Sequence, residues 1–222
     1  MVKAVFLDFY GTVVYEDNEI IKVITERILL SGKAQNAVEI GSFWWQDFVG
    51  MFTKAHSIAF RTQRELELES LRNTIKRFES TEDVYVLSRM MYDHWMSPPI
   101  FKESKRFFEL CPVPIYIVSN IDTDDINKAL AFHNIKPASI VTSEDARTYK
   151  PHKEIFEFAL NKFSFEPDEI VHIGDSYSSD VQGAKAAEIN AIWINRFNKP
   201  VPEGVDIAIT NLLDALKTKY FE

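Results

Sequence analysis

Four short motifs contain the residues of this 222-residue chain that are best suited to chemistry. In the first, DFYGT, Asp8 follows an apolar run and leads into a glycine-threonine turn. The others are Ser119-Asn120, then Lys150 before a proline, then the GDSYSSD sequence that ends at Asp180. A carboxylate can act as a nucleophile that forms a covalent intermediate, and a lysine beside it can stabilise developing negative charge. The set therefore predicts nucleophilic catalysis.

These motifs need a scaffold that brings distant parts of the chain together. Residues 3–9 form a nearly continuous apolar run, which is typical of a parallel strand covered on both faces. Strands that alternate with helices, as they do after residue 99, predict a parallel sheet with right-handed crossovers. The further predicted strands are PIYIVSN, SIVTSE, EIVHIGD and AIWIN, and the predicted helices there are residues 101–110, 124–133, 153–163, 181–187 and the segment from Leu212.

The region after the first motif has a different pattern. From Asn18 onward apolar residues recur at helical spacing, and no strand pattern occurs before Ser97. A Pro-Pro pair then closes this helical region. We therefore predict an α/β protein with a doubly wound, Rossmann-like parallel sheet as its catalytic core, residues 1–15 and 99–222. An all-helical cap domain, residues 16–98, is inserted after the first strand.

Composition narrows the range of partners. The net charge of −8 gives no basic surface for nucleic acid or an anionic membrane, and the single cysteine excludes an intrachain disulfide. No apolar run is long enough to cross a bilayer. We expect a cytoplasmic protein whose partner is a small-molecule substrate. The aromatic run from Phe43 to Phe52 predicts cap core first and a lid over the substrate second, and it is also a candidate homodimer surface.

The four motifs, in this order and on these elements, resemble those of the haloacid dehalogenase superfamily of hydrolases. The matching sequences are DFYGT, VSN, YKP and GDSYSSD, and they span Val2 to about Asn195. The helical insertion matches the position of the family's cap. The resemblance implies the doubly wound core that the strand pattern predicts, and a hydrolytic reaction at Asp8.

The motif residue types suit defined roles in such a reaction. We expect Asp8 to form a covalent aspartyl intermediate that water later hydrolyses. Ser119 and Asn120 can donate hydrogen bonds to the non-bridging oxygens of the substrate. Lys150 would neutralise developing charge and keep Asp8 ionised.

The carboxylates of the first and last motifs predict a metal ion. Asp8, Asp175 and Asp180 would raise one another's pKa by repulsion unless a cation were present, and Mg²⁺ prefers such oxygen ligands. By the resemblance, its protein ligands would be the Asp8 carboxylate, the backbone carbonyl of Tyr10 and the Asp175 carboxylate. Asp180 would support these ligands from behind, and Thr12 would brace the nucleophile loop.

Tyr10 separates two versions of this chemistry. The family's phosphatases have a second aspartate here, a general acid and base of the kind worth about 10²–10⁴-fold in rate. As a catalytic residue, Tyr10 could donate a proton but would be a poor base near neutrality. The family's dehalogenases carry tyrosine, because a halide leaving group needs no proton. However, they lack the metal-binding Gly174-Asp175 pair, their tyrosine after the lysine is matched here by Phe156, and the nearest candidate for their cap arginine, Arg27, comes too early.

Three hypotheses follow. The favoured one is a Mg²⁺-dependent phosphatase that acts on a small phosphorylated metabolite through an aspartyl-phosphate intermediate. Its substrate has a good leaving group, or Glu16 or Asp17 supplies the missing proton transfer. The alternatives are a 2-haloacid dehalogenase and a catalytically weak domain that binds a phosphorylated ligand.

Overall fold

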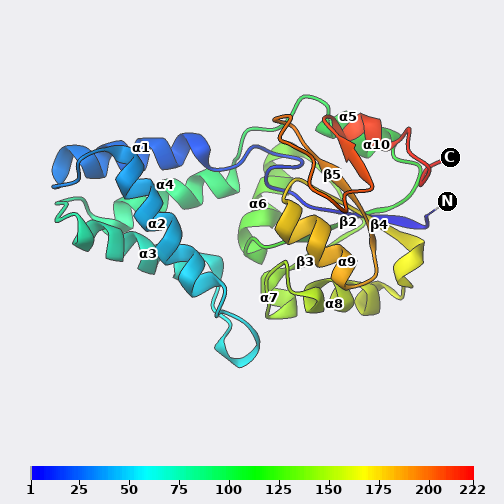
Figure 1. Cartoon of the computed structure of the whole chain (residues 1–222), viewed down its shortest axis with the longest axis horizontal. Coiled ribbons are helices and arrows are strands. Elements are labelled where there is room, and N and C mark those ends of the chain that lie inside the picture. Colours follow the sequence, from blue (N-terminus) through cyan, green and yellow to red (C-terminus); the bar gives the residue numbers. More distant parts are fainter. Residues whose placement is uncertain (1) are drawn as a thin grey trace.

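The computed structural model describes residues 2–222 and arranges them as a parallel sheet flanked by helices (Figure 1). Six strands lie in the order β3-β2-β1-β4-β5-β6, and each neighbouring pair is parallel. The first three strands therefore extend the sheet from its centre to one edge, and the last three extend it from β1 to the other edge. Their bounds are β1 Ala4–Leu7, β2 Ile115–Ser119, β3 Ser139–Thr142, β4 Ile170–Gly174, β5 Asn190–Ile194 and β6 Ile207–Ile209. The predicted doubly wound α/β fold is confirmed.

The first strand, β1, is central and buried on both faces. Val5 lies beside Ile115 of β2 and Val171 of β4, so a parallel neighbour covers each edge of the strand. Because side chains alternate between faces along a strand, Leu7 packs in one apolar cluster and Phe6 in another. Burial on both faces explains why this run shows no polar alternation.

Helices cover both faces of the sheet (Figure 1). The helices on the face of Leu7 are α5 Ser104–Leu110, α6 Thr123–His133 and α10 Leu212–Ala215, and those on the face of Phe6 are α7 Ser143–Ala146, α8 Lys153–Phe163 and α9 Gly183–Ala186. In α8 the buried residues Ile155, Phe156 and Ala159 recur at helical spacing, so one stripe of the helix faces the sheet. This packing holds the carboxyl ends of the strands in place.

Four helices between β1 and β2 form a bundle beside the sheet (Figure 1). They are α1 Asn18–Ser31, α2 Ala37–Phe52, α3 Gln63–Arg77 and α4 Val84–Met96. α1 buries Ile24 and Ile28, which are one turn apart on the same face, and α3 begins with a capping box between Thr62 and Glu65. α4 also packs along α6 of the core. All four helices lie within the predicted cap, residues 16–98, whose boundaries stay a prediction.

Some short elements differ from the sequence prediction. The three-residue strand β6, Ile207–Ile209, pairs with β5 at the sheet edge and is too short for a hydrophobic period to indicate it. α7 is a single turn that follows β3 directly. The predicted helix at 181–187 begins earlier, as a π-helical turn at Tyr177–Gln182 (η3), and continues as α9. Such π-helical turns are frequent at functional sites.

The helices of the described residues are amphipathic or short. α2 has 16 residues and buries Ile40 and Trp44, whereas Val38 and Trp45 are exposed. No helix within residues 2–222 combines the length and the apolar character needed to cross a membrane. The cytoplasmic location, the absence of membrane and nucleic-acid partners, and the candidate homodimer surface stay predictions.

Candidate active site

β1 delivers Asp8 to the carboxyl edge of the sheet, where the order of the strands reverses. The backbone N–H of Asp8 donates to the carbonyl of Ile173 at 2.9 Å, which continues the pairing with β4 by one residue. The following turn needs a glycine, because Gly11 has a φ of +86° and a Cβ there would lie 2.4 Å from Oδ1 of Asp175. The first motif therefore places its carboxylate next to that of the fourth motif.

Lys150 lies between two carboxylates. Its Nζ donates to Oδ1 of Asp8 at 2.6 Å and to Oδ1 of Asp180 at 2.7 Å, and its side chain is 2% exposed. Burial alone would lower the pKa of this lysine, but Asp180 and Asp8 raise it above its ordinary value. Lys150 is therefore charged and pairs with Asp8, whereas the catalytic roles of both residues stay predictions.

The second motif positions this lysine. Asn120 accepts a hydrogen bond from the Lys150 backbone N–H through Oδ1 at 2.7 Å, and its Nδ2 donates to the Lys150 carbonyl at 3.2 Å. One N–H of the Asn120 amide remains for a substrate oxygen. Ser119 is buried, and its Oγ accepts from the backbone N–H of Ile121 at 3.5 Å, which leaves its own hydroxyl proton. The predicted contacts of both residues with substrate stay predictions.

Asp180 is held from three sides. It accepts hydrogen bonds from Lys150, from Nε2 of His172 at 3.0 Å and from the backbone N–H of Ser176 at 2.9 Å. The glycine of the fourth motif makes room for it, because a Cβ on Gly174 would lie 2.2 Å from Asp180 Cγ. Although burial acts to raise it, the charge of Lys150 and the His172 bond hold the pKa of Asp180 below its ordinary value. Asp180 is thus an ionised partner behind the lysine.

Asp8, Asp175 and Asp180 form an acidic cluster. Each offers one oxygen, and these atoms lie within 4.8 Å of one another. Asp175 accepts a hydrogen bond from Oγ1 of Thr12 at 3.4 Å, whereas Lys150 bonds only the other two carboxylates. Burial and the charges of Asp8 and Asp180 raise the pKa of Asp175 to about 8, and burial, opposed by Lys150, raises that of Asp8 to about 6. The cluster holds more negative charge than one lysine balances.

Tyr10 points from the first motif toward the cap. Its hydroxyl donates a hydrogen bond to the backbone carbonyl of Trp95, in the last turn of α4. Burial and the charge of Asp17 raise the pKa of Tyr10 well above its ordinary value. The single hydroxyl proton is thus engaged in joining core and cap. The catalytic role of Tyr10 and the metal contact of its carbonyl stay predictions.

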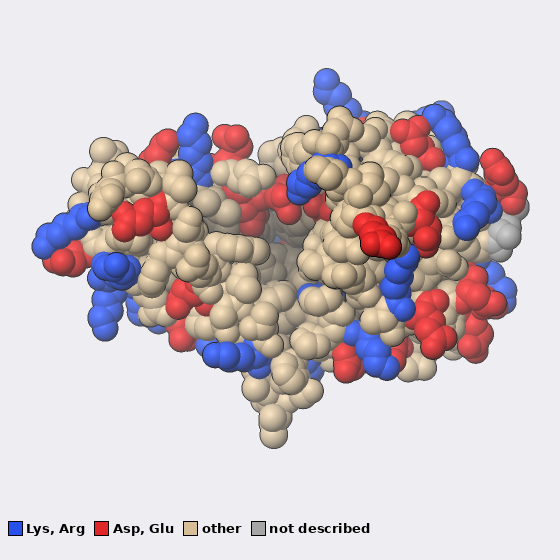
Figure 2. Space-filling model, viewed as in Figure 1, with Lys and Arg blue, Asp and Glu red and all other residues tan. Residues whose placement is uncertain are grey.

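A cavity of about 230 Å³ lies between these residues and the cap. The sequence-predicted residues on its wall are Asp8, Tyr10, Ser119, Asn120, Lys150, Asp175 and Asp180. Thr12 is buried beneath the wall and reaches the site through Asp175. The cap contributes Trp45, Gln63 and Trp95. Figure 2 shows a hollow between the two parts of the molecule, with acidic side chains along its rim.

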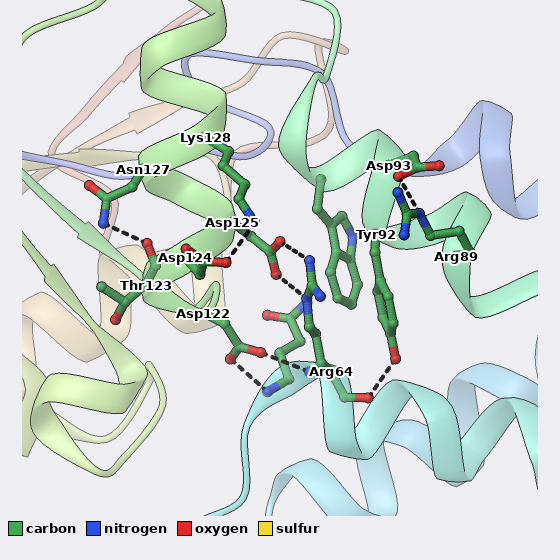
Figure 3. Close-up of polar contacts among 12 residues, drawn as sticks. Arg64, Arg89, Tyr92, Asp93, Asp122, Thr123, Asp124, Asp125, Asn127 and Lys128 are labelled. Atoms are coloured by element: carbon green, nitrogen blue, oxygen red, sulfur yellow. Dashed lines mark hydrogen bonds and ion pairs between the residues drawn. The ribbon is translucent and has the colours of Figure 1, made fainter. Parts of the chain in front are cut away.

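Polar contacts hold the cap against the core beside this cavity (Figure 3). Asp122, just before α6, accepts hydrogen bonds from the backbone N–H groups of Gln63 and Arg64 at 2.8 and 2.9 Å. The Arg64 side chain pairs with Asp125, its Nε lying 2.8 Å from Oδ2. Tyr92 of α4 donates to the Arg64 carbonyl at 3.0 Å. Asp122 and Asp125 therefore anchor the start of α3 to the core, and Tyr92 links α4 to α3.

Sequence reasoning missed His172, to which it gave no role. This buried residue bonds Asp180, and its ring packs edge-on against Phe156 at 5.0 Å. The available signal was a polar residue in an otherwise apolar buried strand. A buried imidazole requires a hydrogen-bond partner, so this pattern indicates that His172 contacts another polar residue. Sequence reasoning also assigned nothing to Glu67, which lies inside the cap with 5% of its surface exposed. A glutamate in a charged helical segment gives no sign of burial.

The comparisons with known proteins agree with this geometry. Residues 2–188 match the family model described as haloacid dehalogenase-like hydrolase. The (S)-2-haloacid dehalogenase 1 of Pseudomonas sp. (strain CBS-3) is 23% identical over 204 residues, which are 90% of this chain and 87% of that relative. Phosphoserine phosphatase of Thermus thermophilus is 33% identical over 61 residues, which are 28% of this chain and 24% of that relative.

A solved structure shares the fold over nearly the whole chain. The structure of YfnB from Bacillus subtilis, bound to magnesium, has a TM-score of 0.76 and 19% identity, and the likeness covers 97% of each chain. At this identity it supports the fold alone. Since the family model matches well over half of the sequence, the protein belongs to the haloacid dehalogenase-like hydrolase family.

Proposed function

We propose that the protein is a Mg²⁺-dependent phosphatase that acts on a small phosphorylated metabolite through an aspartyl-phosphate at Asp8. The observation that carries this proposal is the acidic cluster, whose oxygens lie within 4.8 Å while Lys150 pairs with only two of its three carboxylates. A compact set of oxygen donors with excess negative charge suits a small hard cation. A reaction without metal gives no reason to bring Asp175 against the other two.

The donor set fits Mg²⁺ in chemistry as well as in charge. Asp8 and Asp175 would hold the ion together with the Tyr10 carbonyl, because Asp180 already accepts three hydrogen bonds. A bound Mg²⁺ would neutralise charge on the phosphoryl oxygens. The structure of YfnB, which shares this fold, was solved with magnesium bound, and the partial match to a phosphatase is consistent with this function.

The residues of the chain divide the phosphoryl transfer between them. An Asp8 oxygen attacks phosphorus, an oxygen–phosphorus bond forms, and the bond to the leaving oxygen breaks. Ser119 and the free N–H of Asn120 donate to the non-bridging oxygens, and Lys150 holds the nucleophile in position. Water then cleaves the aspartyl-phosphate, which releases inorganic phosphate and restores Asp8.

The leaving oxygen needs a proton that Tyr10 is not placed to give. Asp17 lines the same cavity, and its Oδ2 accepts a hydrogen bond from Nε1 of Trp95 at 3.2 Å, which fixes the carboxyl. Burial, opposed by this bond, raises the pKa of Asp17 to about 6, close to the range of an efficient general acid. We assign the proton transfer to Asp17 and not to Glu16, which lacks such an anchor within the described residues.

The experiment is a panel of phosphate esters assayed with Mg²⁺ and with a chelator, for the wild type and Asp8→Asn. We expect turnover that requires both Mg²⁺ and Asp8. A panel without Mg²⁺-dependent turnover contradicts the proposal. In that case Tyr10→Asp separates the remaining readings: restored turnover means a competent scaffold without its acid, and tight phosphate-ester binding without turnover means a binding domain.

The role of Asp17 has its own test. Asp17→Asn should slow the hydrolysis of alkyl phosphates, whose leaving oxygen needs a proton, by about 10²-fold or more. Hydrolysis of p-nitrophenyl phosphate should fall much less, because nitrophenolate leaves without protonation. Equal losses on both substrates would remove Asp17 from this role.

A 2-haloacid dehalogenase is the second candidate. Tyr10 and the relative that matches over 90% of this chain favour it. Against it, Lys150 is the sole basic residue among those on the described cavity wall, and two carboxylates already bind it. Arg27 pairs instead with Glu82, its Nε 3.1 Å from Oε1. Halide release from 2-chloropropionate in the presence of a chelator would establish this activity, and its absence would remove it.

A further inference from the structure

A second cavity, of about 110 Å³, lies within the cap. It shares Asp17, Trp45, Gln63 and Trp95 with the cavity at the sheet edge, so the two are neighbours along a common wall. Aromatic rings dominate its lining, which includes Trp44, Trp45, Phe48 and Trp95. A group attached to a phosphate at Asp8 would extend from the first cavity into this one.

One ionisable residue lies deep in this aromatic lining. Glu67, on α3, is 5% exposed, and its Oε1 is shielded from solvent without a hydrogen-bond partner among the described residues. None of the residues on the cavity wall is basic. Arg64, one turn earlier on α3, is already bound to Asp125. Oε1 of Glu67 therefore lies at the cavity without a hydrogen-bond partner among the described residues.

A second carboxyl oxygen in this cavity also lacks a partner. Oδ1 of Asp17 is shielded from solvent and makes no hydrogen bond with the described residues. Nε2 of His94 lies 3.4 Å from it without hydrogen-bond geometry, and burial lowers the pKa of His94, which favours the neutral ring. The cavity thus combines aromatic faces with two carboxyls that have no cation beside them.

This combination selects a ligand chemistry. A buried carboxyl without a partner is costly, and an apolar ligand would leave it so. A ligand with a second anionic group would be repelled. An organic ammonium group satisfies both features, because aromatic faces attract cations, and the carboxyl ionises beside the ammonium group and supplies its counter-charge.

We propose that the cap cavity binds the ammonium group of the substrate, primary or quaternary, beside Glu67 and the aromatic rings of Trp45 and Trp95. The substrate class is then a phosphate ester of an amino alcohol, and this step rests on the proposed phosphatase function. The rings would contact the alkyl groups of the ammonium, and Glu67 would face its charge. The cap, and not the motifs, would set this specificity.

Calorimetric titration with phosphate-free probes tests the cavity apart from catalysis. Choline is compared with 3,3-dimethylbutan-1-ol, which has the same shape without the charge, and with ethanolamine, which separates primary from quaternary ammonium. We expect choline or ethanolamine to bind at least about 10-fold more tightly than the uncharged alcohol. Equal affinities for all three probes would overturn the proposal.

Two variants identify the residues responsible. Glu67→Gln keeps the shape of the side chain and should weaken cation binding at least about 10-fold, while the uncharged alcohol binds as before. Glu69→Gln, on the same helix but paired with Arg61 at the surface, is the matched control. Trp45→Leu should also weaken cation binding. Because 65% of the Trp45 surface is exposed, this substitution should leave the cap folded. Unchanged cation affinity in Glu67→Gln would overturn the proposal.

Failure of this inference and failure of the proposed function give different results. Turnover of p-nitrophenyl phosphate without cation binding would preserve the phosphatase and remove the ammonium site. Cation binding without turnover of any phosphate ester would preserve the site and remove the phosphatase. When both hold, phosphocholine or phosphoethanolamine should be turned over with a lower KM than glycerol phosphate, and Glu67→Gln should abolish that preference.

Discussion

The cavity at the sheet edge and the cavity in the cap differ in how their buried carboxyls are balanced. At the sheet edge, Lys150 bonds Asp8 and Asp180, so the chain itself supplies a counter-charge. In the cap, Glu67 faces aromatic rings and no described residue bonds its Oε1. A carboxyl that is paired within the chain has its charge balanced before any ligand binds, whereas an unpaired carboxyl can gain a partner only from a ligand. The two proposals thus place the nucleophile at the sheet edge and substrate selectivity in the cap, with Asp17 on the wall of both cavities.

The largest expected effect isolates the reaction at the sheet edge. Asp8→Asn removes the nucleophile and should lower the turnover of p-nitrophenyl phosphate by about 10⁴-fold or more. Cation binding in the cap should persist, because Asp8 does not line that cavity. Asp214→Asn, a carboxylate paired with Lys217 on the surface, serves as the control. Residual turnover above about a tenth of the wild type would contradict a covalent role.

The next effect concerns the balance of charge around the lysine. Lys150→Met removes the lysine charge from two buried carboxylates, Asp8 and Asp180, and should lower the free energy of unfolding by about 3–5 kcal/mol at pH 7. Lys153→Met, which loses only an exposed ion pair with Glu157, should cost less than about 1 kcal/mol. Urea unfolding measures both variants. A loss in Lys150→Met as small as in its control would mean that the pairing contributes little.

A pH-dependent effect tests the unbalanced carboxyl of the cap. Burial and the charge of Asp17 raise the pKa of Glu67 from 4.5 to about 8 in the folded protein. The folded state therefore binds more protons than the unfolded state within this window, so stability falls as the pH rises through it. Each unit of pKa difference corresponds to about 1.4 kcal/mol, and the full effect is a few kcal/mol.

The variant Glu67→Gln removes this contribution. Between pH 5.5 and 8.5 its free energy of unfolding should fall by about 2–3 kcal/mol less than that of the wild type. Glu69→Gln should follow the wild type, since it keeps Glu67. Urea unfolding at both pH values makes the measurement. If the free energy of unfolding depends on pH in the same way for wild type and Glu67→Gln, the pKa of Glu67 is not raised in the folded protein. That result would weaken the contrast between the two cavities.

The smallest effect concerns the contact that joins the two regions. Tyr10→Phe removes the hydrogen bond to the Trp95 carbonyl and should lower the free energy of unfolding by about 1 kcal/mol. Tyr15→Phe, at an exposed tyrosine in the same loop, should be close to neutral. Thermal and urea unfolding provide the comparison. An unchanged stability of Tyr10→Phe would mean that the cap is held mainly by the contacts of Asp122 and Arg64.

The core was predictable from sequence because several independent patterns agree there. Apolar runs bounded by turns indicated the strands, and the carboxyl ends of parallel strands necessarily share one edge, which brought Asp8 toward Asp175. The edge strand β6 escaped this reasoning because three residues show no period. His172 escaped because its importance depends on Asp180, eight residues later, folding back over the strand.

The cap cavity was not predictable in the same way. Helical spacing indicates which residues share a face of one helix, but not which faces of four helices meet. Glu67 lies among charged residues on α3, a pattern that is typical of a solvated face. The aromatic run of α2 predicts core first and a lid second. Trp44 is buried and lines the cap cavity alone, whereas its neighbour Trp45 is exposed and lines both cavities. Only tertiary packing separates the two tryptophans.

The contact between Tyr10 and Trp95 also bears on how such proteins diverge. One residue supplies both the side chain that distinguishes the two chemistries and a bond that holds the end of α4. A lineage that replaced this tyrosine with aspartate would gain an acid and lose that bond in a single mutation. Compensation would have to come from the cap. We therefore expect the residue at position 10 and the cap residues around the end of α4 to change together among related sequences.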